Sequence, residues 1–263
     1  TEEDPKELAA CAQLAEKYGY NEVNLNCGCP SNRVQSGKFG ASLMLRPNAV
    51  ANCIDAMRTA CSLPVTIKHR LGVDEMDSYD ELASFVGQVS NAGCEVFIIH
   101  ARKAWLNGLS PKENREIPPL NYPWIYRLKK EFPSLMIVIN GGITLMSQVT
   151  THLNHLDGVM MGRKIYEDPW FLSEVDQILF KNPAIAKTRM EVLQQMLPYI
   201  EKEIANGEKL SHITRHLVGL YKGKPGGRKF RRHIADFAHK ESADHNTLVD
   251  ASRKTHESLA TNI

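Results

Sequence analysis

Short apolar segments alternate with helical segments along about the first 180 residues, and this alternation constrains the fold more than any other feature. The apolar segments are residues 23–26, 65–68, 96–100, 137–140 and 159–161. Helices are expected between them, over 4–19, after Pro47, and over 77–91, 122–131, from about 144, and 168–180. Short apolar strands separated by helices predict a parallel sheet with both faces covered.

Two α/β architectures accommodate five such strand–helix units. One is an open doubly wound sheet, and the other is a (β/α)8 TIM barrel of eight strands and about 250 residues. Polar residues stand at the carboxyl ends of four different strands, namely Asn26, Lys68, His100 and Asn140. Such residues converge in a barrel mouth, whereas in an open sheet they gather only at the switch point. The sequence therefore predicts a TIM barrel over residues 1–180.

The pattern beyond residue 180 is helical only. Helices are expected over residues 188–206, 209–221, 228–240 and 245–260, which predicts an all-α domain over 181–263. From residue 179 onward, 15 Lys and Arg face 9 Asp and Glu, whereas the rest of the chain carries 17 against 21. A basic segment joined to a slightly acidic body indicates an anionic macromolecule as partner. No apolar run approaches the 18 residues that would span a membrane, so no membrane partner is expected.

The basic residues are densest in the segment 221–232, which has six Lys and Arg among twelve residues and no acid. Helical spacing places Arg228, Arg231 and Arg232 on one face. A solvated charged surface is one interpretation of this segment. Glycines and aromatic residues interleaved with the arginines also fit a clamp on a phosphate backbone.

The segment 23–30 is the strongest candidate for a reactive site. Alternation puts Asn24 and Asn26 on one face of a strand, and Pro30 fixes the backbone just after Cys29. A thiol on a rigid turn beyond inward-pointing amides favours chemistry, although a buried inert cysteine is the commoner case. Cys27 and Cys29 lack a second pair at ligand spacing, so no metal site is predicted. All six cysteines lie within the first 94 residues and are expected to be free thiols in the cytoplasm.

Two glycine-containing turns follow the last two strands. Asn140-Gly141-Gly142 enters one helix, and Gly162-Arg163 enters the next. Backbone N–H groups at such turns bind phosphate, and barrels often place a phosphate site after their seventh and eighth strands. Two ordinary tight turns would look the same. Neither a Rossmann fingerprint nor a Walker motif is present.

Three functional hypotheses follow from these residues. The first is an enzyme in which Cys29 acts beside a phosphate-bearing cofactor. The second is a thiol hydrolase that uses Cys29, His100 and Asn140 as nucleophile, base and orienting group. The third is a non-catalytic RNA-binding protein that relies on the segment 222–232.

These motifs together resemble the tRNA-dihydrouridine synthases, most closely their bacterial A-type branch. The resemblance rests on N-L-N-C-G-C-P-S-N-R-V-Q-S-G-K-F-G-A-S-L-M, V-T-I-K-H-R-L-G, the H-A-R-K-A-W-L block and its continuation, I-N-G-G-I, V-M-M-G-R and the basic C-terminal segment. It implies an FMN-binding (β/α)8 barrel, a helical domain that grips tRNA, and a monomer. It also implies reduction of a D-loop uridine to 5,6-dihydrouridine, with NADPH as reductant.

The resemblance implies a role for each matched residue. Cys29 corresponds to the cysteine that protonates one carbon of the uracil while reduced FMN supplies hydride to the other. Asn26 and Arg70 correspond to residues that hold the extruded uridine. Contacts with tRNA fall on Lys112, Arg115, Arg228 and Arg231. Contacts with the flavin fall on Lys68, His100, Asn140, Gly141, Gly142, Gly162 and Arg163.

Members of this family begin with three further βα units, upstream of the helix that starts here at Asp4. The resemblance therefore implies that this chain carries five of eight barrel strands. A barrel lacking three strands exposes two sheet edges and its apolar interior. We expect these 263 residues alone to aggregate or to purify without flavin.

Overall fold

The computed structural model describes the fold over residues 4–31, 39–182 and 188–260. By compactness the chain divides into two units, Thr1–Met161 and Gly162–Ile263, and each is described by itself. The functional boundary that the sequence predicts at residue 180 stays a prediction.

The first unit is built around one parallel sheet of five strands in the order β1-β2-β3-β4-β5. The strands are β1 (Val23–Cys27), β2 (Val65–Arg70), β3 (Val96–His100), β4 (Met136–Asn140) and β5 (Gly158–Met160). The helices are α1 (Pro5–Lys17), η1 (Gly40–Leu45), α3 (Pro47–Ala60), α4 (Tyr79–Asn91), η2 (Glu113–Arg115), α5 (Tyr122–Glu131) and α6 (Met146–Leu153). The α/β alternation and the parallel sheet are as the sequence predicts.

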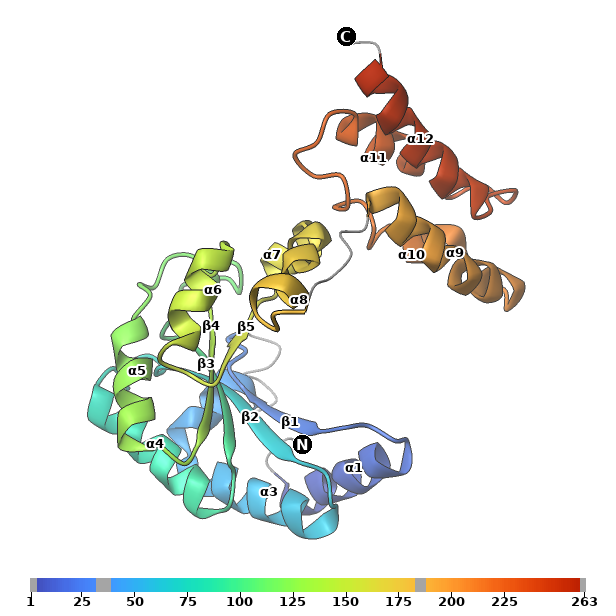
Figure 1. Cartoon of the computed structure of the whole chain (residues 1–263). Coiled ribbons are helices and arrows are strands. Elements are labelled where there is room, and N and C mark those ends of the chain that lie inside the picture. The colour runs from blue at the N-terminus through green and yellow to red at the C-terminus, as the bar shows by residue number, and fades with distance from the viewer. Residues whose placement is uncertain (1–3, 32–38, 183–187, 261–263) are drawn as a thin grey trace. The chain divides into compact units, whose positions relative to one another are not determined.

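The α-helices of this unit form a single layer. In Figure 1, α1, α3, α4, α5 and α6 lie on one side of the sheet, and α1 packs on α3, which packs on α4. Among the described residues of this unit, no α-helix covers the other face, so helices supply only one of the two covered faces that the sequence predicts. The covered face carries the core, in which Leu25, Ile67, Phe97, Ile99 and Ile139 are buried.

The opposite face of the sheet carries the polar residues. Asn24 and Asn26 of β1 are exposed, and Lys68, Val138 and Asn140 are half-buried. Because side chains alternate along a strand, these residues share the face that the helices leave uncovered. This one-sided covering is what positions the candidate site.

Local capping explains where several helices begin. The Asp4 side chain accepts a hydrogen bond from the backbone N–H of Lys6 at 2.9 Å, at the start of α1. Ser78 and Glu81 form a reciprocal capping box at the start of α4. Helix α6 begins two residues later than expected, because the Gln148 side chain accepts from the backbone N–H groups of Thr144 and Leu145.

The second unit is helical. Its elements are α7 (Arg163–Glu167), η3 (Pro169–Glu174), α8 (Val175–Ile178), α9 (Arg189–Ala205), α10 (Leu210–Thr214), α11 (Gly227–Phe237) and α12 (Asn246–Ala260). Buried residues of α9, α11 and α12 form its core, among them Leu193, Ile200, Phe230, Ile234 and Leu248. None of the described helices is long and apolar enough to cross a membrane.

Two helices expected in this region are shorter or broken. The segment expected as one helix over 168–180 is η3 followed by α8, and it begins at Pro169, which lacks a backbone N–H donor. The segment 209–221 is helical only over Leu210–Thr214. A Cβ atom on Gly219 would lie 2.4 Å from the carbonyl oxygen of Glu167, so this stretch follows a close backbone contact rather than a helix.

Candidate active site

Strand register brings the predicted site residues of the first unit into two rows. Asn26 of β1 pairs with Lys68 of β2 in one row. In the next row toward the carboxyl ends, Arg70 pairs with His100, and His100 pairs with Asn140. These five residues come from four adjacent strands and share the face without helices. The structure therefore assembles them as the spacing of the strands predicts.

Cys29 lies on a hydrogen-bonded turn directly after β1. The side-chain oxygen of Asn26 accepts from the backbone N–H of Gly28 at 3.0 Å, and the carbonyl of Cys29 accepts from the N–H of Ala41 at 2.8 Å. The half-buried thiol has its Sγ 3.6 Å from the hydroxyl oxygen of Ser31. The neighbouring Cys27 faces the core and is fully buried. Of the two thiols, only that of Cys29 can meet a ligand.

Arg70 ties this turn to the loop that follows β3. Its Nε donates to the carbonyl of Gly28 at 3.1 Å, and its Nη1 donates to the carbonyl of Asn114 at 2.8 Å. Burial, followed by the nearby charge of Arg115, lowers the pKa of Arg70 to about 10, while Cys29 acts in the opposite direction. The guanidinium therefore stays charged at neutral pH and interacts electrostatically with the Cys29 sulfur.

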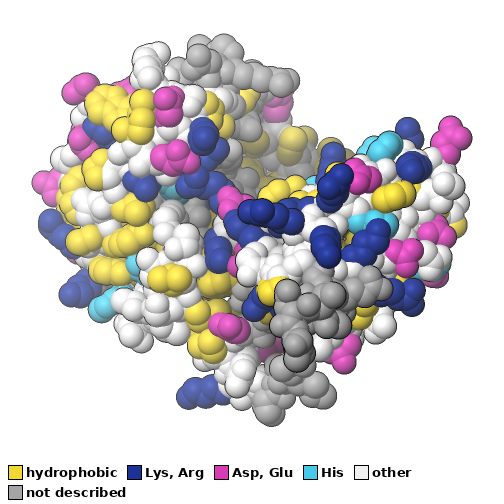
Figure 2. All heavy atoms as spheres, turned by 90° about the horizontal axis from the view of Figure 1, so that it is seen from above, with side chains coloured by type: hydrophobic (Ala, Val, Ile, Leu, Met, Phe, Trp, Pro, Cys, Tyr) yellow, Lys and Arg dark blue, Asp and Glu magenta, His cyan; other side chains and the backbone are white. Residues whose placement is uncertain are grey.

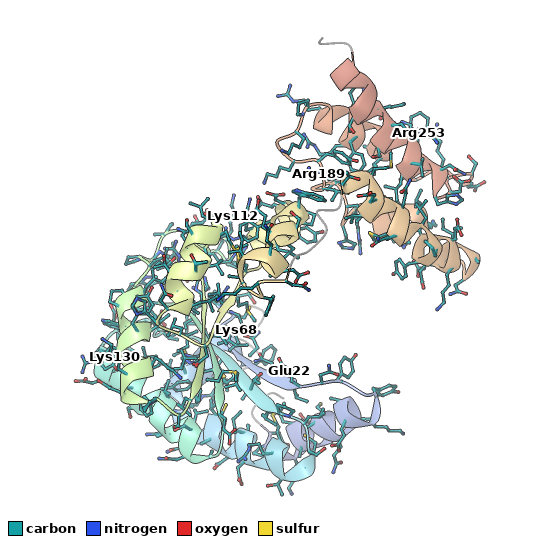
Figure 3. All side chains as sticks on the ribbon, in the orientation of Figure 1. Glu22, Lys68, Lys112, Lys130, Arg189 and Arg253 are labelled. Atoms are coloured by element: carbon teal, nitrogen blue, oxygen red, sulfur yellow. The ribbon has the colours of Figure 1, made fainter. Side chains whose placement is uncertain are left out.

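Lys68 is a half-buried cation on the same face. Figure 3 shows it on the side of the sheet away from the helices, whereas Lys130 points outward from α5. Burial, with a smaller contribution from Arg70, lowers the pKa of Lys68 to about 8. Because burial disfavours the charged form of Lys68, an anionic or electron-rich ligand beside it would stabilise the ammonium.

The turn after β4 has the backbone that a ligand needs for close approach. Gly141 and Gly142 have φ angles of +110° and +72°, which side chains rarely adopt. A Cβ atom on Gly141 would lie 3.0 Å from Nε2 of His100. Asn140 is fixed by its amide, which donates to the carbonyl of Met160 at 2.9 Å. The hydroxyl of Tyr122 donates to the carbonyl of Gly141 at 2.8 Å and so fixes the turn.

The remaining predicted residues lie outside this face. Lys112 and Arg115 are exposed in the loop that contains η2, beyond the carboxyl end of β3. Figure 3 labels Lys112 in this loop. Gly162 and Arg163 open α7 in the second unit. Arg228 and Arg231 are exposed on α11, also in the second unit. Many Lys and Arg side chains are visible on the face of the molecule seen in Figure 2.

The structure identifies three residues of the site region that sequence reasoning missed. Asn114 is fully buried and organises the loop after β3, and Tyr122 supports the Gly141 carbonyl. His69, next to Lys68, faces the core between Phe85 and Phe97, and burial lowers its pKa to about 4. Strand alternation could have assigned His69 to the core, but no local signal marks Asn114. Among the described residues, no His, Cys, Asp and Glu side chains gather in a group that could hold a metal ion.

Comparison with known proteins identifies the class to which this fold and site belong. The family model described as dihydrouridine synthase matches residues 1–256. The chain belongs to the dihydrouridine synthase family.

Individual relatives are similar over most of their length. The tRNA-dihydrouridine(20/20a) synthase of Shewanella oneidensis is 52% identical over 260 residues, which cover 99% of this chain and 76% of the relative. The enzymes of the same name from Vibrio parahaemolyticus and Escherichia coli K12 are each 53% identical, over 97% and 94% of this chain and 79% and 72% of theirs.

A dihydrodipicolinate synthase from Agrobacterium tumefaciens aligns with 96% of this chain and 92% of its own, at 11% identity and a TM-score of 0.43. At this TM-score, the alignment does not test whether the five strands belong to a barrel.

Proposed function

We propose that this protein reduces uridine at positions 20 and 20a of tRNA to 5,6-dihydrouridine, with FMN as cofactor and NADPH as reductant. The observation that carries the proposal is the Cys29 turn beside a row of polar residues on one face of a parallel sheet. Family membership and the names of the relatives support the same reaction. They also weigh against a thiol hydrolase and a non-catalytic RNA-binding protein.

The five parallel strands fit part of a (β/α)8 barrel. Helices cover one face of the sheet, as in a barrel wall, and the polar row faces the other side, where a barrel has its interior and mouth. A doubly wound sheet would carry helices on both faces. We propose that β1 to β5 are consecutive strands of such a barrel.

The residues present fit a flavin mononucleotide. Lys68 offers a desolvated cation, and Gly141 and Gly142 leave bare backbone at the turn, where a Cβ on Gly141 would lie 3.0 Å from Nε2 of His100. We propose Lys68, His100, Asn140, Gly141 and Gly142 as flavin-binding residues. Gly162 and Arg163 remain sequence-based candidates for the same role. Reduced FMN, when bound, supplies the hydride that adds to one carbon of the uracil 5,6 double bond.

Cys29 supplies the proton. Its S–H bond breaks as the proton moves to the other carbon of the double bond, and the sulfur keeps the electron pair as a thiolate. Solvent then returns a proton to the sulfur, and the Arg70 guanidinium holds the turn through its hydrogen bond to the carbonyl of Gly28. Asn26 holds the turn from the side of β1, and we propose that it and Arg70 also contact the extruded uridine. Lys112, Arg115, Arg228 and Arg231 are proposed tRNA contacts.

The test compares the wild-type protein with Cys29→Ala. Both are made in a protein that joins these residues to the three upstream βα units of the family, and in that protein wild type is expected to purify yellow and to form dihydrouridine in unmodified tRNA with NADPH. Cys29→Ala should retain flavin and lose on the order of 10²–10⁴ in the rate of uridine reduction, the contribution typical of a positioned acid. Oxidation of the reduced flavin by tRNA at the wild-type rate in this variant would refute the role of Cys29. A wild-type protein that forms no dihydrouridine would refute the function.

A further inference from the structure

Trp105 is a large aromatic side chain that the loop after β3 presents to solvent. Its relative exposure is 36%, whereas its neighbours Ala104 and Leu106 are buried. The backbone on both sides is fixed: the N–H of Ala104 donates to the carbonyl of Gly72 at 2.9 Å. The N–H of Leu106 donates to a carboxylate oxygen of Asp74 at 2.8 Å. The outward position of Trp105 is therefore built into the loop.

Asn114 clamps the backbone of Trp105 itself. The side-chain oxygen of Asn114 accepts from the N–H of Trp105, and its amide donates to the carbonyl of Trp105, each at 2.8 Å. The same amide donates to the carbonyl of Leu109 at 3.2 Å, and Asn114 is fully buried. A buried amide with all of these partners rigidifies the loop that it joins. The indole is thus held on a preorganised support.

Trp105 has cations near it, together with the acids Asp77, which pairs with Lys103, and Glu113 and Glu116 in the same loop. The Lys103 ammonium lies 4.1 Å from the centroid of the indole ring and 2.6 Å from a carboxylate oxygen of Asp77, which holds it there. Lys112 and Arg115 are exposed on the same loop. A rigid aromatic side chain among cations is the arrangement that unpaired nucleotides recognise, because the base stacks and the phosphates meet the charges.

We propose that Trp105 is a stacking site for an unpaired base of the RNA substrate, and that Asn114 is the positioning residue that presents it. The inference rests on the proposed function. Extrusion of a uridine into an active site removes stacking from its neighbours, and an indole at the rim replaces part of that loss. The adenine of a dinucleotide could also stack. RNA is favoured because Lys112 and Arg115 extend the cationic surface along the loop, which suits a chain of several phosphates.

The experiment measures binding of an unmodified tRNA transcript by the flavin-loaded protein used for the Cys29→Ala test. Trp105→Ala should weaken binding by roughly 5- to 150-fold, as expected for one stacked base. Trp105→Phe should keep the affinity for tRNA within about threefold of wild type, because phenyl rings also stack. Tyr20→Ala is the matched control: Tyr20 is 65% exposed just before the amino end of β1, and its loss should leave binding unchanged.

Two further measurements separate the possible outcomes. Binding of tRNA should quench a part of the tryptophan fluorescence that is missing in Trp105→Phe, and this readout remains available if Trp105→Ala does not fold. The KM for NADPH should not change in Trp105→Phe or Trp105→Ala. Equal tRNA affinity of wild type, Trp105→Phe and Trp105→Ala would overturn the inference, and so would an effect confined to NADPH. If wild type and Trp105→Ala bind tRNA and form dihydrouridine equally well, the stacking role of Trp105 is wrong and the proposed function stands.

Discussion

Two consecutive residues of β2 show how strand alternation separates chemistry from packing. Lys68 lies on the polar face, half-buried, with its pKa lowered to about 8. His69 lies on the core face, where its Nδ1 is 2.7 Å from the carbonyl oxygen of Arg70 and burial lowers its pKa to about 4. His69 is therefore neutral at physiological pH. Of these two residues, only Lys68 is charged and lies on the face where it can interact with a charged ligand.

A charge kept in a desolvating position costs stability, so replacing Lys68 should stabilise the flavin-free protein. Lys68→Met is expected to raise the free energy of unfolding by up to about 3 kcal/mol at pH 7, from the shift in pKa between the folded and unfolded states. Flavin affinity should fall in the same variant. Urea denaturation and flavin titration measure the two effects, and Lys130→Met, at an exposed position on α5, is the control that should change neither.

The stabilisation by Lys68→Met should depend on pH with a definite sign. Below pH 8 the wild-type folded state carries the desolvated charge, so the advantage of Met is complete. As pH rises from about 8 toward 10.5, the folded protein loses the proton while the unfolded chain keeps it, and wild-type stability rises. The advantage should therefore shrink over this range. An advantage that grew with pH there would contradict the assignment.

At the scale of elements, the turn between β4 and α6 depends on glycine for two separate reasons. Gly142 has a positive φ, and a Cβ there would lie 2.5 Å from Leu120 Cδ1 and 3.0 Å from the hydroxyl of Tyr122. Gly108, in the loop after β3, also has a positive φ, of +83°, but a Cβ there would meet nothing within 4 Å. Alanine substitutions at Gly142 and Gly108 therefore distinguish the cost of backbone strain from the cost of steric crowding.

We expect Gly108→Ala to destabilise the protein by about 1–2 kcal/mol, from the backbone conformation alone. Gly142→Ala should cost about 1–3 kcal/mol more, because the added methyl group has to displace packed side chains. Urea unfolding of both variants measures the difference, and flavin affinity should fall only for Gly142→Ala. Equal losses of stability would show that Leu120 and Tyr122 move aside without cost.

At the scale of the whole molecule, charge is distributed unevenly along the chain. The basic excess lies beyond residue 179, although the net charge of the whole protein is only +2. Arg228 and Arg231 are exposed one turn apart on α11, whose opposite side buries Phe230 and Ile234. The helix thus uses one side for the core of the second unit and leaves the other exposed.

If α11 holds tRNA by its phosphates, Arg228→Ala with Arg231→Ala should weaken tRNA binding and make it less sensitive to salt. The slope of log K against log salt concentration should flatten by about 0.7–0.9 for each lost contact. Flavin content and NADPH oxidation without tRNA should not change. Arg253→Ala, on α12, is the control, because Arg253 already lies 3.5 Å from the carboxylate of Asp250. Unaltered affinity and slope in the double variant would reduce the basic segment to a solvated surface.

The sequence by itself determined most of the elements and, in β1, the face that carries Asn24 and Asn26. It predicted the strand Val96–His100 and the helix Tyr122–Glu131 with their observed bounds, because apolar periodicity and Pro123 act locally. It also predicted Asn26, Lys68, His100 and Asn140 at strand ends, which holds for His100 and Asn140, whereas β1 continues to Cys27 and β2 to Arg70. Parallel register brings the four residues together in two neighbouring rows. Their roles as flavin and uridine contacts stay predictions.

Only the tertiary structure decided the features that depend on distant parts of the chain. The helix expected over 209–221 ends at Thr214, and Gly219 instead packs against the backbone of Glu167. The sequence predicts that Arg70 holds the uridine. In the structure its Nε and Nη1 donate hydrogen bonds to the carbonyls of Gly28 and Asn114. Asn114 reads as an ordinary loop residue, yet its burial organises the loop that presents Trp105. Local propensity sets periodicity and caps, whereas the contacts of Gly219 and Arg70 join residues more than 40 positions apart, and only packing brings such residues together.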